Sequence, residues 1–239
     1  MTQPAAADDP VAHCRAAIAA ADEDLSLSLN YAAPADRARL AALFAFAVEL
    51  RRIPASVSEA PLGEIRLQWH REALDEIAAG KQPRAHPVIA ALAASGAVAG
   101  ARGLLETMID ARARLLYEPT FTSLDDLQRF LADAEAPLAE LALGVARAEE
   151  CAAARALGEA HALARLAPTF APDFAKDAAR TALDLHATHA PALAALSPPA
   201  FGRIAYLALT RGHAARPQGE EWPVMKRLAL VRAVASGRL

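Results

Sequence analysis

The chain has 239 residues and a formal net charge of −3, and 54% of its residues are hydrophobic, with alanine and leucine prominent. This length suits one large domain or two small ones, and the scarcity of glycine, aromatic and β-branched residues favours helices over sheets. The near-neutral charge gives no reason to expect a nucleic-acid partner. No apolar run approaches the roughly 20 residues that a membrane-spanning helix needs.

The N-terminus and the cysteines indicate the compartment. Residues 1–10 are polar and contain proline, so we expect a flexible N-terminus followed by one domain over residues 11–239. The start lacks the basic and then apolar pattern of a secretory signal. Cys14 and Cys151 lie far apart, which suggests buried thiols in a reducing compartment. We therefore expect a cytoplasmic protein, with peripheral contact at the inner face of the membrane as an open alternative.

The first helix is expected from Pro10 to Ala21, and the next strong signal is the stretch from Pro34 to Gly80. This stretch predicts two helices joined by a polar bend. The first helix must end at or before Ile53, because Pro54 lacks an N–H and disfavours helical geometry in the residue before it. The second starts at Pro61 and stops at Gly80. Its predicted apolar seam consists of Leu62, Ile65, Trp69, Ala73 and Ile77.

Further helices follow along the rest of the chain. They are expected over 86–94, 101–117, 124–145 with a kink at Pro137, 149–167, 172–196, 197–211 and 220–236. The last helix is amphipathic, and its predicted apolar side consists of Trp222, Met225, Leu228, Val231 and Val234. No stretch alternates with a period of two, and neither a repeat nor a linker is evident. The sequence therefore predicts a single all-α domain, a helical bundle.

Two segments resemble the squalene/phytoene synthase family. The family's "LPadrR…LyAFcR" helix is matched by Pro34, Asp36, Arg37, Ala45 and Phe46, and the segment after it by Glu64, Leu67, Trp69, Arg71 and Leu74. The later motif "LGxAxQLTNILRDvxED" keeps its frame at Leu157, Gly158, Ala160 and Leu163. The resemblance implies an isoprenoid (trans-prenyl) synthase-like bundle around a central cavity.

The acidic residues that the family's chemistry requires are missing. That chemistry ionises an allylic diphosphate with Mg²⁺, which is held by carboxylates on two facing helices and by the phosphates. Neither carboxylate cluster is kept, so we expect no catalytic residue, no metal and no cofactor. Mg²⁺ would be a cofactor only if the chain were an active prenyl transferase. Eight residues stand at vestigial positions of the motifs or of the cavity wall: Pro54, Ala55, Ser58, Glu59, Leu115, His161, Ala162 and Arg165.

The closest resemblance is to a branch that reads "VSE…GEIRLQWWRDAL" and includes relatives of a mitochondrial assembly factor of respiratory complex I. Our first hypothesis is therefore a non-catalytic homologue that binds a protein partner or a hydrophobic ligand. We expect its interior to bind lipid or to be collapsed, because Ala55, Leu115 and Ala162 are small or apolar. The expected partner surface consists of Arg51, Arg52, Glu64 and Arg71.

Other hypotheses remain open. One is an active Mg²⁺-dependent head-to-head prenyl transferase making squalene or phytoene, and another is a subunit that pairs with an active homologue. His186 and His189 have a spacing that can hold a metal. Since no third ligand is evident near them, a surface pair is expected instead.

Overall fold

The computed structural model describes residues 9–219 and 222–239, and these residues form helices and no strand. The all-α fold class is thereby confirmed. Most of the predicted flexible N-terminus, and Glu220 at the predicted start of the last helix, lie outside the described residues. The α-helices are α1 Pro10–Ala21, α2 Glu23–Leu29, α3 Arg37–Arg52, α4 Ala60–Ala78, α5 Pro87–Ser95, α6 Arg102–Arg114, α7 Leu124–Ala134, α8 Pro137–Leu143, α9 Ala148–Phe170, α10 Ala175–His189, α11 Pro198–Arg203, α12 Thr210–Ala214 and α13 Pro223–Ser236.

Helix α3 is the centre of the bundle. Every residue from Leu40 to Val48 is buried, because the small alanines among its larger side chains let neighbouring helices approach on all sides. Helices α1, α5 and α8 pack against it. As predicted, α3 ends before Pro54, a short 3₁₀ turn covers Pro54–Ser56, and Pro61 lies in the first turn of α4.

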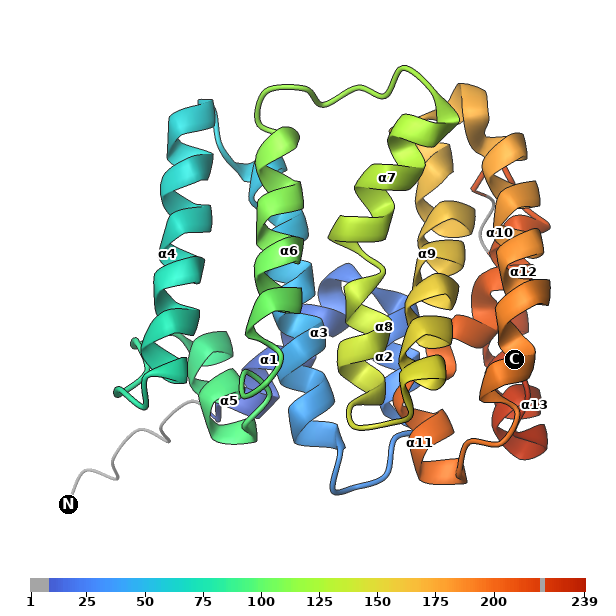
Figure 1. Ribbon diagram of the computed structural model, residues 1–239, viewed down its shortest axis with the longest axis horizontal. Coiled ribbons are helices and arrows are strands. Elements are labelled where there is room, and N and C mark those ends of the chain that lie inside the picture. Colours follow the sequence, from blue (N-terminus) through green and yellow to red (C-terminus); the bar gives the residue numbers. More distant parts are fainter. Residues whose placement is uncertain (1–8, 220–221) are drawn as a thin grey trace.

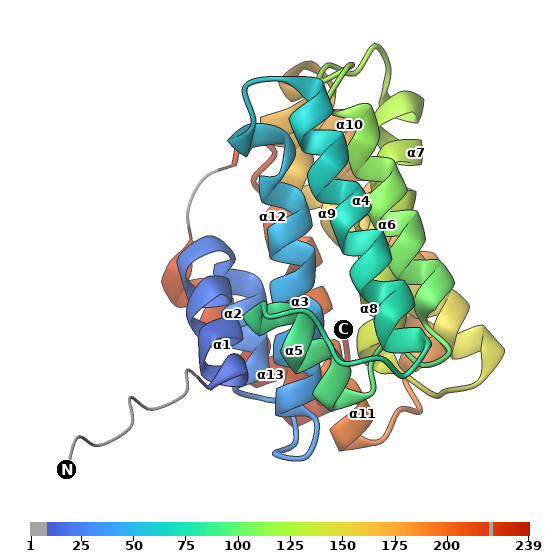
Figure 2. The same ribbon diagram turned by 90° about the vertical axis from the view of Figure 1, so that its left-hand side faces the viewer.

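Helix α9 organises the other half of the molecule. It packs against α7, α8, α10 and α12. In Figure 1, α4, α6, α7, α9 and α10 stand as a row of roughly upright helices, while Figure 2 shows α1, α2 and α5 lying beside the lower part of α3. The chain therefore forms one continuous bundle rather than separate lobes. No helix in the described ranges combines the length and the apolar character that a membrane span requires.

Three of the expected helices are interrupted. The helix expected over 124–145 is not merely kinked: α7 ends at Ala134, and α8 starts at Pro137, which cannot continue the hydrogen-bond ladder of α7. The helix expected over 172–196 is divided into a 3₁₀ segment at Pro172–Phe174, α10 and a 3₁₀ segment at Ala190–Leu193. The helix expected over 197–211 is divided into α11, a 3₁₀ segment at Ala205–Leu209 and α12. The first of these breaks places Glu135 at a bend that faces the interior.

Two predicted apolar faces are wrong in part. In α4, Trp69, Ala73 and Ile77 pack against the core as predicted. Leu62 and Ile65 are exposed instead, because α4 packs mainly on α6 and Gly63 meets the side chain of Leu116. In α13, the larger part of the predicted apolar side faces solvent and a lysine faces the core.

Gly158 provides a test of how closely α8 and α9 pack. A Cβ at this position would lie 2.9 Å from both the carbonyl oxygen of Ala136 and the Cβ of Ala139. We expect Gly158→Ala to lower the free energy of unfolding by about 1–3 kcal/mol, because the backbone must shift to accept the methyl group. Gly103→Ala is the matched control, since a Cβ there meets nothing within 4 Å. Urea denaturation should show the control unchanged or up to about 1 kcal/mol more stable. Equal stability of the two variants would contradict the close packing.

Candidate functional site

The interior between α2, α3 and α9 contains charged side chains. Asp22 caps the N-terminus of α2 by accepting a hydrogen bond from the backbone N–H of Leu25 through Oδ1. Its other oxygen, Oδ2, lies 2.5 Å from Nη1 of Arg51 and 2.8 Å from Nη1 of Arg165. Asp22 is 2% exposed, so one buried carboxylate joins the start of α2 to the last turn of α3 and to α9.

The second buried carboxylate is Glu135, at the bend between α7 and α8. Nη2 of Arg51 lies 2.5 Å from its Oε2, and Arg112 of α6 donates to its Oε1. Arg112 is 1% exposed and also donates to the carbonyl oxygen of Ala134. Arg51 thus bridges two carboxylates, and Glu135 bridges two guanidinium groups.

A third carboxylate, Asp24, lies at the other side of this interior. Its Oδ2 is 2.7 Å from Nε2 of His213, 3.6 Å from Nε2 of His161 and 3.4 Å from Nε of Arg165. Nζ of Lys226, from α13, is 3.0 Å from its Oδ1 and 2.8 Å from Oε2 of Glu23. We refer to Asp22, Glu23, Asp24, Arg51, Arg112, Glu135, Arg165 and Lys226 as the interior charge network.

Two opposing effects determine the pKa values of the carboxyl groups in this network: burial raises them, and pairing with cations lowers them. Burial by itself would raise the pKa of Glu135, but Arg51 and Arg112 outweigh it and lower the pKa to about 2. In the same way, partners outweigh burial at Asp22 and Asp24, whose pKa values lie below their ordinary range. Burial lowers the pKa of His161 to about 3. The carboxylates are therefore ionised at neutral pH and His161 is neutral.

This network leaves almost no empty space. The cavity bounded by Arg51, Glu135, His161, Arg165 and Tyr206 has a volume of about 10 Å³. That is close to the minimum that a single water molecule requires. Side chains thus fill the space at this network, where the resemblance implies a central cavity. The expectation of an apolar wall is wrong in part: Ala162 lines this space together with Leu25 and Leu138, but so do Arg51, Glu135 and Arg165.

The residues present do not fit a Mg²⁺–diphosphate pair. Ala55, Ser58 and Glu59 lie exposed around the bend after α3 and do not line the interior. Each interior carboxylate is already paired with a cation, and the network contains four carboxylates and four cationic side chains. No uncompensated negative charge remains to attract a divalent ion, and a diphosphate would have to displace Asp22 or Glu135 from the arginines.

Asp24, His161 and His213 also form a group whose ligand atoms all lie within 4.8 Å of one another. Such a set of residue types can hold a transition metal. However, Arg165 and Lys226 contact the same carboxylate, so an added cation would meet two positive charges. The electrostatics favour an internal ion-pair cluster at this position.

The structure divides the predicted site residues into two groups. His161, Ala162 and Arg165 line the filled interior together with Arg51. The positions Pro54, Ala55, Ser58, Glu59 and Leu115 do not line it: the first four belong to the bend after α3 or flank it, and Leu115 packs against the cluster around Phe130.

The predicted partner surface requires one correction. Arg51 is half-buried, and its guanidinium turns inward to pair with Asp22 and Glu135. Arg52 and Glu64 are exposed, and Arg71 is half-buried with its guanidinium 2.6 Å from Asp110. The predicted surface pair of histidines is also wrong in part, since His186 is buried and burial lowers its pKa.

Sequence reasoning missed Asp22, Asp24, Arg112, Glu135 and Lys226 as interior residues. One available signal was Arg112, which follows Met108 and Ile109 on an apolar helix face where a surface arginine is out of place. Lys226 gives the same signal between apolar residues of α13. Which carboxylate each cation meets depends on the tertiary fold and has no local signature.

Comparisons with known proteins agree with this fold. The profile of the family described as squalene/phytoene synthase matches residues 18–184. Two similar crystal structures are those of squalene synthase HpnC from Alicyclobacillus acidocaldarius, with 16% identity and a TM-score of 0.68, and of a dehydrosqualene synthase in complex with ligand, with 15% identity and a TM-score of 0.67. Each comparison covers 95% of this chain, and 94% and 96% of the other chain, respectively. No curated protein sequence matches at a significant level.

Glu135 tests the energetic weight of the network. Glu135→Gln leaves Arg51 and Arg112 without this counter-charge, so we expect the free energy of unfolding to fall by about 3–5 kcal/mol. Asp133→Asn, two residues earlier, is the matched control. Asp133 is 59% exposed, and its Oδ1 lies 3.6 Å from Nη2 of Arg155, which is too long for a good hydrogen bond. Its effect should stay within about 0.5 kcal/mol. A Glu135→Gln variant as stable as the control in urea denaturation would refute this role.

The pH dependence of stability provides a second test. The ordinary pKa of histidine is 6.5, so the unfolded chain binds a proton at His161 that the folded chain does not bind until about pH 3. The free energy of unfolding should therefore fall as the pH is lowered from 6.5, and Glu135 should steepen the fall below its ordinary pKa of 4.5. In His161→Phe, the slope between pH 6.5 and 4.5 should become shallower. An unchanged slope would show that His161 is not responsible.

Proposed function

The chain belongs to the squalene/phytoene synthase family, and we propose that it is a member that has lost prenyl-transfer chemistry and acts by binding a partner. Under this proposal it is a respiratory complex I assembly-type factor, or another factor that binds protein or lipid through its surface. Because its centre does not accept a substrate, the fold acts through its outer faces.

The observation that carries the proposal is the filled interior. Arg51, Glu135, Asp22 and Arg165 pair with one another where only about 10 Å³ of space remains. An allylic diphosphate needs both room for its chain and cations or metal for its phosphates. Here the cations are already neutralised by protein carboxylates, and displacing one carboxylate would leave it buried and unpaired, at a cost of several kcal/mol.

The outer face of α4 supports a protein partner. The helix lies at the edge of the bundle (Figure 1), and on it Ile65 is 65% exposed and Leu62 is 46% exposed. Glu64 is exposed on the same helix, beside a groove lined by Ile65, Trp69 and Arg71. Exposed aliphatic residues bordered by charges of both signs are typical of contact surfaces. This face replaces Arg51 in the expected partner surface.

The alternative function is Mg²⁺-dependent head-to-head prenyl transfer. It is favoured by the similarity in fold to two proteins described as a squalene synthase and a dehydrosqualene synthase. Fold similarity at 15–16% identity does not carry over the activity, because function depends on the residues of a site. The alternative would also require the interior charge network to open.

A direct assay separates the two functions. The purified chain, incubated with farnesyl diphosphate and Mg²⁺, should release no pyrophosphate above the background of a reaction without protein. The expected absence follows because, among the described residues, the carboxylates of the interior charge network are already paired with cations and not available to a metal. The matched positive control is squalene synthase HpnC from Alicyclobacillus acidocaldarius, assayed under the same conditions. Pyrophosphate release by this chain, abolished by EDTA, would establish the transferase instead.

A further inference from the structure

Helix α13 has two opposed faces of unexpected character. Its inner face buries Lys226, Leu230 and Ala233. Its outer face exposes four aliphatic or thioether side chains, at positions that follow one side of the helix. These residues, which we call the α13 stripe, are Val224, Met225, Leu228 and Val231, with exposed fractions of 70%, 53%, 57% and 53%. They make up four of the nine large hydrophobic residues exposed among the described residues.

The rotation of α13 is fixed by contacts on its inner face. Nζ of Lys226 is held 2.8 Å from Glu23 and 3.0 Å from Asp24 of α2. At the start of the helix, the ring of Trp222 lies directly against Gly212, where even a Cβ would overlap it. The helix cannot turn its stripe inward without moving Lys226 away from two carboxylates. The exposure of the stripe is therefore a built-in feature of this fold.

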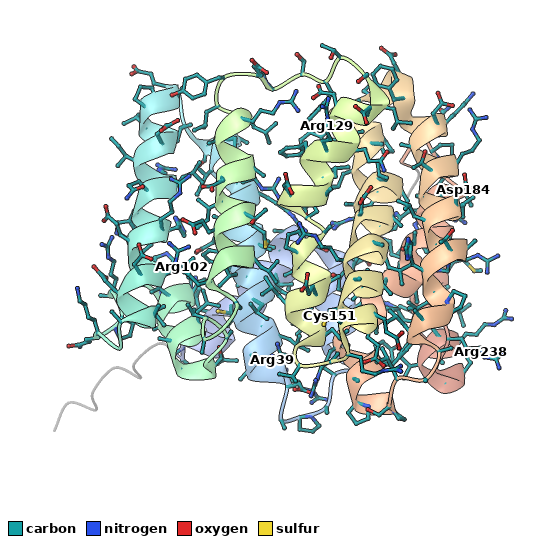
Figure 3. The ribbon with its side chains drawn as sticks, in the orientation of Figure 1. Arg39, Arg102, Arg129, Cys151, Asp184 and Arg238 are labelled. Carbon is teal, nitrogen blue, oxygen red and sulfur yellow. The ribbon has the colours of Figure 1, made fainter. Side chains whose placement is uncertain are left out.

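Basic residues border the stripe. Arg227 is exposed at one edge of the stripe, and Arg232 is exposed between Leu228 and Met225 around the helix. Arg238 follows the helix at the lower right in Figure 3. The guanidinium of Arg216 lies 4.8 Å from the ring of Trp222 at the other end. The only acidic residues in the sequence from 216 to 239 are Glu220 and Glu221, which lie outside the described residues. Lys226 is buried against Glu23 and Asp24, so the four arginines of this segment, set against its two glutamates, leave an excess charge of +2.

We propose that the α13 stripe docks the protein onto an anionic lipid bilayer, with α13 lying in the plane of the interface. A short helix with aliphatic residues on one side and arginines beside and among them inserts its apolar side between headgroups, while the arginines pair with lipid phosphates. At 14 residues α13 is too short to span the bilayer. This docking is independent of whether the protein has catalytic activity.

Charge decides between the candidate occupants of the stripe. In a symmetric dimer through this face, Arg227 and Arg232 of one copy would lie against the same arginines of the other, and like charges would repel. The outer face of α4, by contrast, carries Glu64 and Glu72 beside its arginines, and is less suited to an anionic surface. A bilayer that contains acidic phospholipid is the occupant that matches both the stripe and its basic border.

The experiment is co-sedimentation of the purified full chain with phosphatidylcholine vesicles, prepared with and without phosphatidylglycerol. The wild-type chain should bind the anionic vesicles, bind more weakly at high salt, and bind the neutral vesicles poorly. Leu228→Asp combined with Val231→Asp should weaken binding by about tenfold or more. Arg227→Gln combined with Arg232→Gln should have a similar effect, and it provides the decisive variant if the first pair fails to fold.

Val145→Asp is the matched control, because Val145 is 102% exposed but lies in the loop between α8 and α9, away from the stripe and from α4. It should bind like the wild type. The proposal is overturned if the wild type does not bind anionic vesicles, if the stripe and arginine variants bind as it does, or if Val145→Asp weakens binding equally. Self-association in the absence of vesicles that is lost in the stripe variants would also overturn it, in favour of a second copy of the chain.

Discussion

Arg51 is the residue on which the interior depends, because it is held between two carboxylates from distant parts of the chain. Asp22 comes from the start of α2 and Glu135 from the bend between α7 and α8. The Arg51 side chain is only 22% exposed, so without these partners its guanidinium would carry a desolvation cost. The end of α3, the cap of α2 and the bend at Pro137 are therefore mutually dependent, and Arg165 extends the same constraint to α9.

The network is better understood as a way of occupying space than as a source of stability. Pairing ions in a protein interior roughly repays their desolvation, and apolar side chains of similar volume can stabilise as much or more. What the ions impose is geometry: each guanidinium must meet its carboxylate at hydrogen-bond distance. This requirement leaves little freedom for the interior to open, which is consistent with the residual volume of about 10 Å³.

Local signals in the sequence predicted the fold but not the chemistry of its centre. Helix α1, the end of α3 at Pro54 and the start of α4 near Pro61 follow from hydrophobic spacing and from proline, which act over a few residues. The sequence predicts Arg51 on a polar outer face, with Arg52, Glu64 and Arg71. Its true partners are 29 and 84 residues away, a pairing that neither spacing nor composition encodes.

The faces of α4 and α13 differ from the prediction for the same reason. A helix buries the face that its neighbours can accept, which is not always its most apolar face. Gly63 turns α4 because it permits close contact with Leu116. Lys226 turns α13 because Asp24, buried beside His161 and His213, accepts a cation from outside the central helices. Once that lysine is inside, Val224, Leu228 and Val231 can only be outside. The charge balance of the interior thus determines which residues the last helix presents at the surface, and links the closed centre of this bundle to its exposed apolar stripe.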